Sequence, residues 1–228
     1  MRSRLLDLYE RLLSAYGPQH WWPGDQEPFV VVLGAILTQS TSWANVERAL
    51  AGLRAGGLLS PRAILTAPEE TLAAAIRSSG YFRVKARRLR AFARVLEERF
   101  GGSLERLFAL PAAELRAALL GIDGVGPETA DDVILYAARE PVFVIDAYTR
   151  RVMSRLGVRP VSDSYERWQA LFMDNLPRDA TLFNEYHALL VRHAKSICRK
   201  TPLCGRCALL PTCPTGRTLV GGDISVNG

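Results

Sequence analysis

Apolar positions recur with the period of an α-helix along nearly the whole chain. Near the N-terminus, one apolar stripe is formed by Leu5, Leu6, Leu8, Tyr9, Leu12 and Leu13. The run FVVVLGAILTQ, residues 29–39, is almost wholly apolar and predicts a buried helix. Its β-branched residues would also allow a strand, but the sequence has no clear hairpin signal or alternating run. We therefore predict an all-α protein.

Two stretches of the chain weakly repeat one arrangement. Residues 66–89 parallel residues 109–133, and each has a proline-led helix, a glycine-bearing turn and a second helix. In the first copy, Thr66 to Glu69 resembles a capping box, which predicts a helix from about Ala67 to Ser78. Only the second copy has the full Gly124-Val-Gly126 turn, whose glycines permit positive φ and the close approach of a phosphate to a helix N-terminus.

The segment PVFVIDAYTRRVMSRLG, residues 141–157, combines an apolar run with an aspartate and a helical pattern. Asp146 ends the apolar run, and a helix is predicted from about Ala147. An aspartate directly ahead of a helix can act as its N-cap, which is a purely structural role. After Pro214 the chain has no clear pattern, so we expect a loose tail there.

Composition adds a basic balance to this helical picture. The chain has 228 residues, enough for one domain or two small ones, and a formal net charge of +6. A positive charge suits a polyanionic partner such as nucleic acid, although solvated helix faces can also be basic. No apolar run is long enough to span a bilayer, and the N-terminus lacks the features of a signal peptide. We expect a cytoplasmic, nucleoid-associated protein that makes no contact with membranes.

All four cysteines fall close together near the C-terminus. They read C-x5-C-x2-C-x5-C and comprise Cys198, Cys204, Cys207 and Cys213. Nothing in the sequence indicates the oxidising compartment that disulfides need, so a metal site is the better interpretation. Four clustered thiolates can hold a [4Fe–4S] cluster or a tetrahedral zinc ion.

The glycine turn and the aspartate together resemble a known family. Gly121 to Gly126 lead into Pro127, and Asp146 follows about twenty residues after the turn. This order is similar to that of the endonuclease III, or helix-hairpin-helix, superfamily of DNA glycosylases, over roughly Phe29 to Pro214. The resemblance implies a two-lobed all-α fold in which the damaged base and Asp146 meet in a cleft. It also implies a helical bundle over 23–139, a cluster domain made of 1–22 and 140–214, and a tail over 215–228.

The resemblance also assigns roles to single residues. Asp146 matches the catalytic aspartate, and Gln39 matches the glutamine that fills the gap left by the extruded base. Tyr81 falls where the family inserts a wedge residue. DNA contacts are expected from Gly124, Gly126, Lys85, Arg199, Lys200 and Arg206. The family's cluster loop usually reads C-x6-C-x2-C-x5-C; the first spacing here is one residue shorter, and a [4Fe–4S] cluster is still favoured over zinc.

One departure from the family bears on the reaction. Members that also cut the DNA strand carry a lysine at the start of the second hairpin helix, where this chain has Glu128. A carboxylate cannot form the imine with the sugar that a lysine nucleophile forms. We therefore expect a monofunctional glycosylase whose AP-lyase activity is weak or absent, with Asp146 stabilising a positively charged sugar or orienting water.

Three of the tryptophans bear on the class of damaged base that the protein would bind. Trp21, Trp22 and Trp43 stand near helix starts, where tryptophans are more often core than ligand platforms. The WWP motif nevertheless resembles the bacterial 3-methyladenine glycosylase branch, which also has glutamate at the lysine position. A cationic alkylated purine could stack on such rings, with Glu128 beside the same pocket.

Two other functions remain open at this stage. The first is an endonuclease III-like glycosylase for oxidised pyrimidines, and the second is a non-catalytic DNA-binding module on the same scaffold. The three histidines, His20, His187 and His193, show no ligand spacing and are interpreted as ordinary residues. The expected partner is double-stranded DNA containing a damaged base, bound by a monomer.

Overall fold

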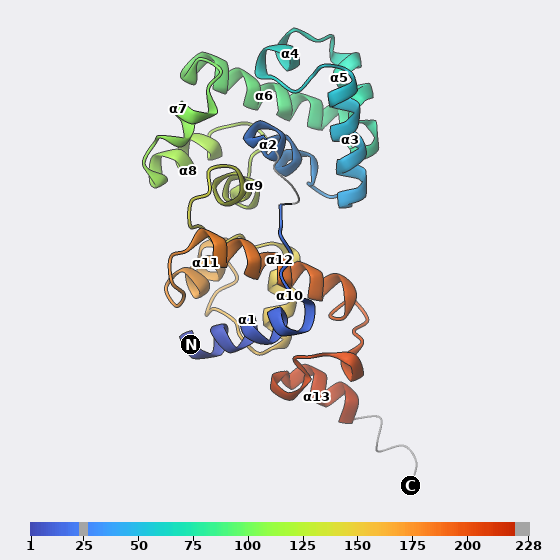
Figure 1. The fold of residues 1–228 in the computed structure, drawn as a ribbon, viewed down its shortest axis with the longest axis vertical. Helices are drawn as coiled ribbons and strands as arrows, with labels where there is room; N and C mark the ends of the chain where they lie inside the picture. The colour runs from blue at the N-terminus through green and yellow to red at the C-terminus, as the bar shows by residue number, and fades with distance from the viewer. Residues whose placement is uncertain (23–26, 222–228) are drawn as a thin grey trace. The chain divides into compact units, whose positions relative to one another are not determined.

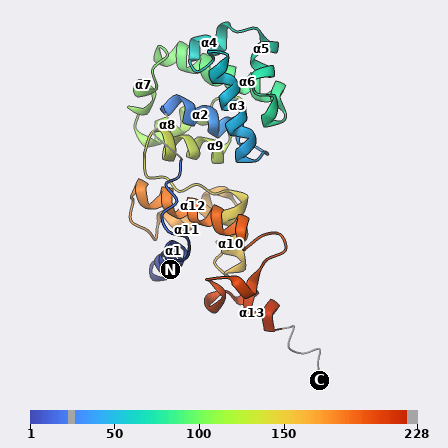
Figure 2. The ribbon, with the colours of Figure 1, turned by 45° about the vertical axis from the view of Figure 1, so that its right-hand side comes forward.

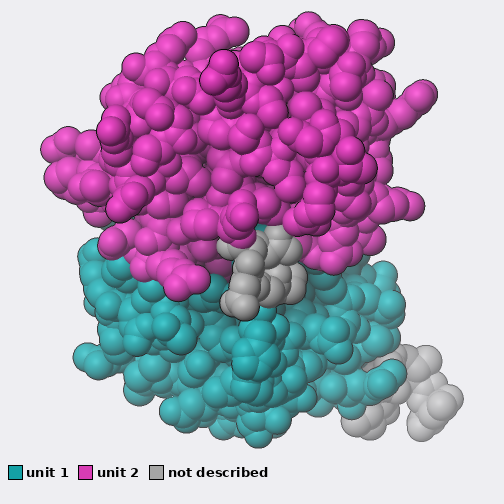
Figure 3. Space-filling view, turned by 45° about the horizontal axis from the view of Figure 1, so that its top comes forward, with its two compact units in different colours: residues 1–24, 141–228 teal, residues 25–140 magenta. Residues whose placement is uncertain are grey.

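The computed structural model describes residues 1–22 and 27–221. Within these ranges the chain is helical and has no strand, which confirms the all-α prediction. Contacts between Cα atoms divide it into two compact units (Figure 3). Unit 1 comprises residues 1–24 and 141–228, and unit 2 comprises residues 25–140. None of the helices in the described ranges is long and apolar enough to cross a membrane.

Unit 2 is built around one buried helix. Its helices are α2 (Pro28–Leu37), α3 (Trp43–Ala55), α4 (Pro61–Thr66), α5 (Glu69–Ala75), η1 (Arg77–Ser79), α6 (Phe82–Phe100), α7 (Leu104–Phe108), α8 (Ala112–Leu120), α9 (Pro127–Asp132) and the π-helical turn η2 (Val133–Ala137). Every residue of α2 from Phe29 to Leu37 is buried, as the apolar run predicts. Helices α3, α6 and α9 and the turn η2 pack against α2 (Figures 1 and 2).

Unit 1 brings the two ends of the chain together. Its helices are α1 (Arg2–Tyr16), α10 (Ala147–Arg155), α11 (Tyr165–Met173), α12 (Ala180–Ser196), η3 (Cys204–Arg206), η4 (Leu210–Thr212) and α13 (Pro214–Gly221). Helix α12 packs on both α1 and α10. The buried hydroxyl of Tyr186 donates a 2.9 Å hydrogen bond to the carbonyl of Leu5, which ties α1 to α12. Phe143 stacks on Phe172 with their ring centres 3.8 Å apart, so the core continues toward α11.

Two local predictions were wrong. The Thr66 hydroxyl donates to the carbonyl of Arg62 at the end of α4 and does not cap the next helix. Helix α5 therefore begins at Glu69 and ends at Ala75, and the short helix η1 follows it. Residues 214–221, expected to be mostly loose tail, form α13, because Gly216 packs against Cys213 and the helix rests on η3, η4 and α10. The rest of the predicted tail, 222–228, lies outside the described residues.

Candidate active site

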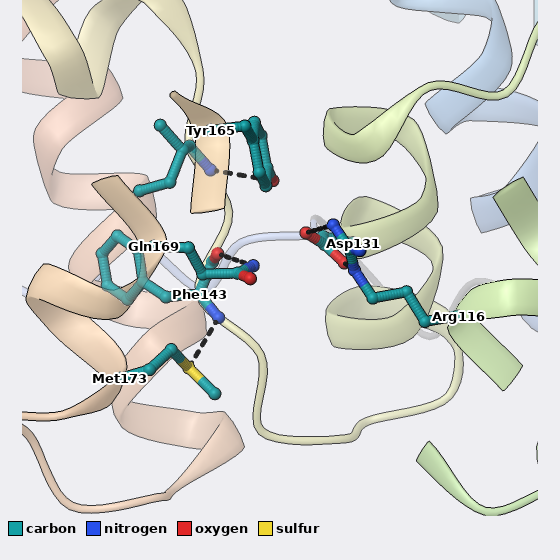
Figure 4. Close-up of polar contacts among 7 residues, drawn as sticks. Arg116, Asp131, Phe143, Tyr165, Gln169 and Met173 are labelled. Carbon is teal, nitrogen blue, oxygen red and sulfur yellow. Dashed lines mark hydrogen bonds and ion pairs between the residues drawn. The ribbon is translucent and has the colours of Figure 1, made fainter. Parts of the chain in front are cut away.

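Helix α11 positions the chain that leads into Asp146. The extended segment before Asp146 has no regular backbone partners, so side chains of α11 bind its polar groups (Figure 4). Gln169 donates to the Phe143 carbonyl at 2.9 Å, and the Phe143 N–H points to the Met173 sulfur at 3.3 Å. The Tyr165 hydroxyl accepts from the N–H of Ile145 at 3.3 Å. Residues spaced by four on one helix thus hold the segment on which Asp146 stands.

Asp146 has two different neighbours for its two carboxylate oxygens. Oδ1 accepts a 2.6 Å hydrogen bond from the N–H of Thr149, so Asp146 has the N-cap role that the sequence allowed. Oδ2 lies 3.7 Å from Nε2 of His187, a residue of α12. His187 is only 5% exposed. The interpretation of His187 as an ordinary residue was therefore wrong. No sequence spacing revealed it, because α12 reaches α10 only through tertiary packing.

These contacts favour the ionised form of Asp146. Burial raises the pKa of the carboxyl group, but the nearby imidazole of His187 and the hydrogen bonds from Thr149 lower it by more. The net pKa lies below the ordinary value of 3.8, so Asp146 is a carboxylate at neutral pH. A partly buried negative charge of this kind can stabilise a positive charge that develops nearby.

A lysine lies beside the aspartate in the same unit, and the sequence did not indicate it. Lys195 is an exposed residue of α12, and its Nζ lies 5.5 Å from the ring centre of Tyr148. The same atom lies 5.8 Å from the ring centre of Trp21. Although Lys195 is exposed as a residue, partial desolvation of its amine lowers the pKa of Lys195, and the charge of Asp146 opposes this shift. Trp21 and Trp22 are both half-buried in unit 1.

In unit 2, Gln39 is held by the second copy of the repeat. Its Nε2 donates to the carbonyl of Gly124 at 3.1 Å and to the hydroxyl of Thr129 at 2.8 Å. Its Oε1 accepts from the guanidinium of Arg88 on α6. The side chain expected to fill the gap in DNA is therefore fixed against the glycine turn by three partners.

The predicted hairpin is formed by α8, the glycine turn and α9. Arg116 of α8 and Asp131 of α9 form a two-pronged ion pair, with N–O distances of 2.8 and 3.3 Å (Figure 4). Gly124 has a φ of +81°, and a Cβ atom there would lie 2.3 Å from Cγ of Arg88. Gly126 precedes α9 with an ordinary φ of −89°, and a Cβ atom there would meet no other atom within 4 Å. The two glycines therefore differ: only Gly124 is required by the fold.

Lys85 does not have the position we expected for a phosphate contact. It is 2% exposed, and its amine donates to the carbonyls of Leu37 at 2.8 Å and Ser79 at 2.7 Å. Burial, together with the charge of Arg88, lowers the pKa of Lys85 to about 8. The prediction for Lys85 was wrong because its long side chain turns inward to bind backbone carbonyls left open at the ends of α2 and η1.

The other predicted residues of unit 2 lie at helix starts. Tyr81 is 73% exposed and has a φ of +45° directly before α6, so its ring stands in solvent. Glu128 is an exposed residue in the first turn of α9, and Trp43 is the half-buried first residue of α3. The predicted site residues are thus distributed over both units: Asp146, Trp21 and Trp22 belong to unit 1, and the remaining base-handling residues belong to unit 2.

The four cysteines line a common pocket in unit 1, together with apolar residues of α10 and α12. The guanidinium of Arg155 lies 3.3 Å from Sγ of Cys198, and the N–H of Gly216 lies 3.3 Å from Sγ of Cys213. Donors at these distances suit sulfur atoms that carry negative charge, as thiolate ligands do. Within the described ranges, 1–22 and 27–221, no three Cys, His, Asp or Glu side chains lie close enough together to bind one metal ion. The donor set fits a group held by all four thiols around the pocket.

The basic residues of the cysteine segment are on the surface. Arg199, Lys200 and Arg206 are all exposed. The carbonyls of Arg199 and Lys200 accept hydrogen bonds from Arg155, at 2.6 and 3.0 Å, so α10 fixes the backbone of this loop. Their side chains remain directed to solvent and available to an anionic partner.

Comparisons with known proteins match this architecture. The model of the HhH-GPD superfamily of base excision DNA repair proteins matches residues 33–178. A Methanocaldococcus jannaschii protein, named as a candidate DNA repair glycosylase, is 44% identical over 90% of this chain and 94% of its own length. A structure of endonuclease III in a trapped covalent intermediate with DNA shares the fold, with a TM-score of 0.84 and 23% identity over 96% of this chain and 99% of that one.

A third similar structure is that of a DNA glycosylase bound to a modified base. H. pylori 3-methyladenine DNA glycosylase bound to 1,N6-ethenoadenine has a TM-score of 0.71 and 26% identity, covering 85% of this chain and 94% of that one. The family match extends over more than half of the chain, and the first relative covers nearly all of it. This chain therefore belongs to the HhH-GPD superfamily of base excision DNA repair proteins and is a DNA glycosylase with the fold of endonuclease III.

Proposed function

We propose that this glycosylase is monofunctional: it hydrolyses the N-glycosidic bond of an alkylated purine in double-stranded DNA and leaves the strand intact. The observation that carries the proposal is the ionised Asp146, which Thr149 and His187 hold at its two oxygens. Glu128 at the start of α9 supports the absence of strand cleavage. The chain would act as a monomer.

Asp146 is the catalytic residue of the proposed reaction. As the base leaves with the electron pair of the glycosidic bond, C1′ of the sugar becomes positively charged, and the carboxylate stabilises that charge. A water molecule then bonds to C1′ and loses one proton, which the carboxylate can accept. His187 is a positioning residue, because it contacts Oδ2 of Asp146 and favours the ionised form.

Strand cleavage by the lyase route needs an amine that attacks C1′ and forms an imine. Glu128 offers a carboxylate instead, which cannot form this imine. The abasic sugar would therefore remain in the uncut strand, where alkali can still cleave the DNA. This is the property that separates the proposal from an endonuclease III-like bifunctional enzyme.

Extrusion of the damaged base is assigned to unit 2. The exposed ring of Tyr81 would enter the stack, and Gln39 would occupy the gap. The hairpin with Gly124 and Gly126 would bind phosphate, while Arg199, Lys200 and Arg206 would add positive charge. The cost of unstacking would be lowest at a damaged base pair, which helps selection.

An alkylated purine is the proposed base because of the tryptophans. Trp21, Trp22, Trp43 and Glu128 are the residues that we assign to the base pocket. The H. pylori relative, whose structure holds an ethenoadenine, supports this class of substrate. Stacking between a base and an aromatic side chain contributes about 1–3 kcal/mol per base.

The cysteines would hold a [4Fe–4S] cluster. Cys198, Cys204, Cys207 and Cys213 would each supply one thiolate, which leaves no open position for substrate and makes the cluster structural or redox-sensing. Iron and acid-labile sulfide analysis tests the assignment: about four of each per chain supports the cluster, and about one zinc with no sulfide contradicts it.

The test of the proposed function is base release from two duplexes, one with 3-methyladenine and one with thymine glycol, scored with and without alkali. We expect release of 3-methyladenine, strand breaks only after alkali, and loss of release in Asp146→Asn with DNA binding retained. Spontaneous cleavage at thymine glycol would instead support the oxidised-pyrimidine function. Binding without release of either base would leave a DNA-binding module.

A further inference from the structure

Lys195 places a positive charge on a ring that the proposed function assigns to base stacking. Its Nζ lies 5.8 Å from the ring centre of Trp21 and 5.5 Å from that of Tyr148. Tyr148 is two residues after Asp146, and Lys195 is on the same helix as His187. All of these residues belong to unit 1, so their arrangement does not depend on unit 2.

The face of an aromatic ring is electron-rich, and a nearby ammonium group uses that attraction. Lys195 already interacts with the electron-rich ring of Trp21, so a cationic base stacked on that ring would gain less cation–π attraction. The positive charge of Lys195 would also repel the base. A base stacked on this ring would lie within about 10 Å of the ammonium group, and repulsion between two unit charges at that separation near a protein surface lowers affinity by about tenfold. A neutral base stacked on the same ring suffers no such repulsion.

The charge of Lys195 also distinguishes the two kinds of leaving group. A neutral purine adduct gains negative charge as the glycosidic bond breaks, and an ammonium group stabilises that charge. A cationic N-methylpurine becomes neutral as it leaves, so the ammonium group gives it no help. Both effects act in the same direction, toward neutral bases.

Building on the proposed function, we infer that Lys195 is a specificity-determining residue that favours neutral alkylated purines, such as etheno adducts, over cationic N-methylated purines. Trp21 then has a role different from the one that the sequence suggests. Stacking on Trp21 remains, but the cation that the ring attracts is the protein's own Lys195, not the base.

The test compares single-turnover base release from matched duplexes that carry either 1,N6-ethenoadenine or 3-methyladenine. In Lys195→Gln, we expect the ratio of ethenoadenine to 3-methyladenine release to fall about tenfold, because the charge is lost while a polar side chain remains. Lys195→Arg keeps the charge and should keep the ratio. Arg192→Gln removes a charge from an exposed position on the same helix and should leave the ratio unchanged.

An unchanged ratio in Lys195→Gln would overturn the inference. If the release of both bases falls equally, Lys195 is a phosphate contact instead. Affinity for the same two duplexes, measured by fluorescence anisotropy in the Asp146→Asn background, does not require base release. If the unmutated enzyme releases neither base, the proposed function fails while the affinity ratio still decides the inference. A ratio that does not depend on Lys195 contradicts it, and a shift toward the cationic base in Lys195→Gln supports it.

Discussion

The side-chain amide of Gln169 donates a 2.9 Å hydrogen bond to the backbone carbonyl of Phe143, three residues before Asp146. Phe143 is fully buried, so this carbonyl has little access to water. In Gln169→Leu, the unsatisfied carbonyl should cost about 1–3 kcal/mol of stability. Because Asp146 loses its support, single-turnover base release should fall about 10- to 100-fold.

The control for Gln169→Leu is Glu166→Ala, an exposed position on the same helix. It should leave both the melting temperature and the rate of base release near those of the unmutated protein. A Gln169→Leu protein with lowered melting temperature but full activity would show that α11 stabilises the fold without positioning Asp146.

The contact between His187 and Asp146 predicts a pH effect. His187 contributes to a pKa of Asp146 below 3.8. The rate of base release should therefore stay constant with falling pH until the pH is below that value, where Asp146 becomes protonated. In His187→Asn, the acidic limb of the pH–rate profile should move to higher pH, since only the bonds from Thr149 would then oppose the rise in pKa caused by burial. Any residual base release in Asp146→Asn should show no such limb. An unmoved limb in His187→Asn would exclude this role of His187.

The buried amine of Lys85 predicts a pH dependence of stability. Its pKa is about 8 in the folded protein and about 10.5 in the unfolded chain, so between these values the unfolded chain binds more protons. The free energy of unfolding should therefore rise with pH from 8 to 10.5, relative to Lys85→Met. The neutral amine keeps two N–H donors for the carbonyls of Leu37 and Ser79. Urea unfolding of both proteins at several pH values measures the difference, which should be flat below pH 7.

The glycine turn offers a matched pair of substitutions. Gly124→Ala forces a Cβ atom against Arg88 and a side chain into a φ of +81°, so it should cost about 1–3 kcal/mol of stability. It should also weaken DNA binding, because Arg88 and Gly124 both hold Gln39. Gly126→Ala has open space and an ordinary φ, so its melting temperature should stay unchanged. Equal melting temperatures for the two variants would contradict this account.

Local patterns determined much of the fold and part of the site. The apolar run 29–37 predicted a buried helix, and the position of Asp146 directly before a helix allowed its N-cap role, because both features depend on neighbours within a few residues. The capping box at Thr66 failed for a related reason: its hydroxyl had a nearer acceptor in the preceding turn, the carbonyl of Arg62. A side chain between two helices can serve either, and sequence spacing does not decide which.

By itself, the sequence determined the helical class, the glycine turn, Asp146 and the clustered cysteines, since each is a pattern of adjacent or periodic residues. Only the tertiary structure decided the surroundings of these groups. The packing of α12 on α10 places His187 beside Asp146 and Lys195 beside Tyr148. Lys85 is buried, and its amine binds the carbonyls of Leu37 and Ser79. The physical reason is that charge, hydrogen bonding and pKa depend on neighbours in space, and residues 40 or so positions apart become neighbours only through packing.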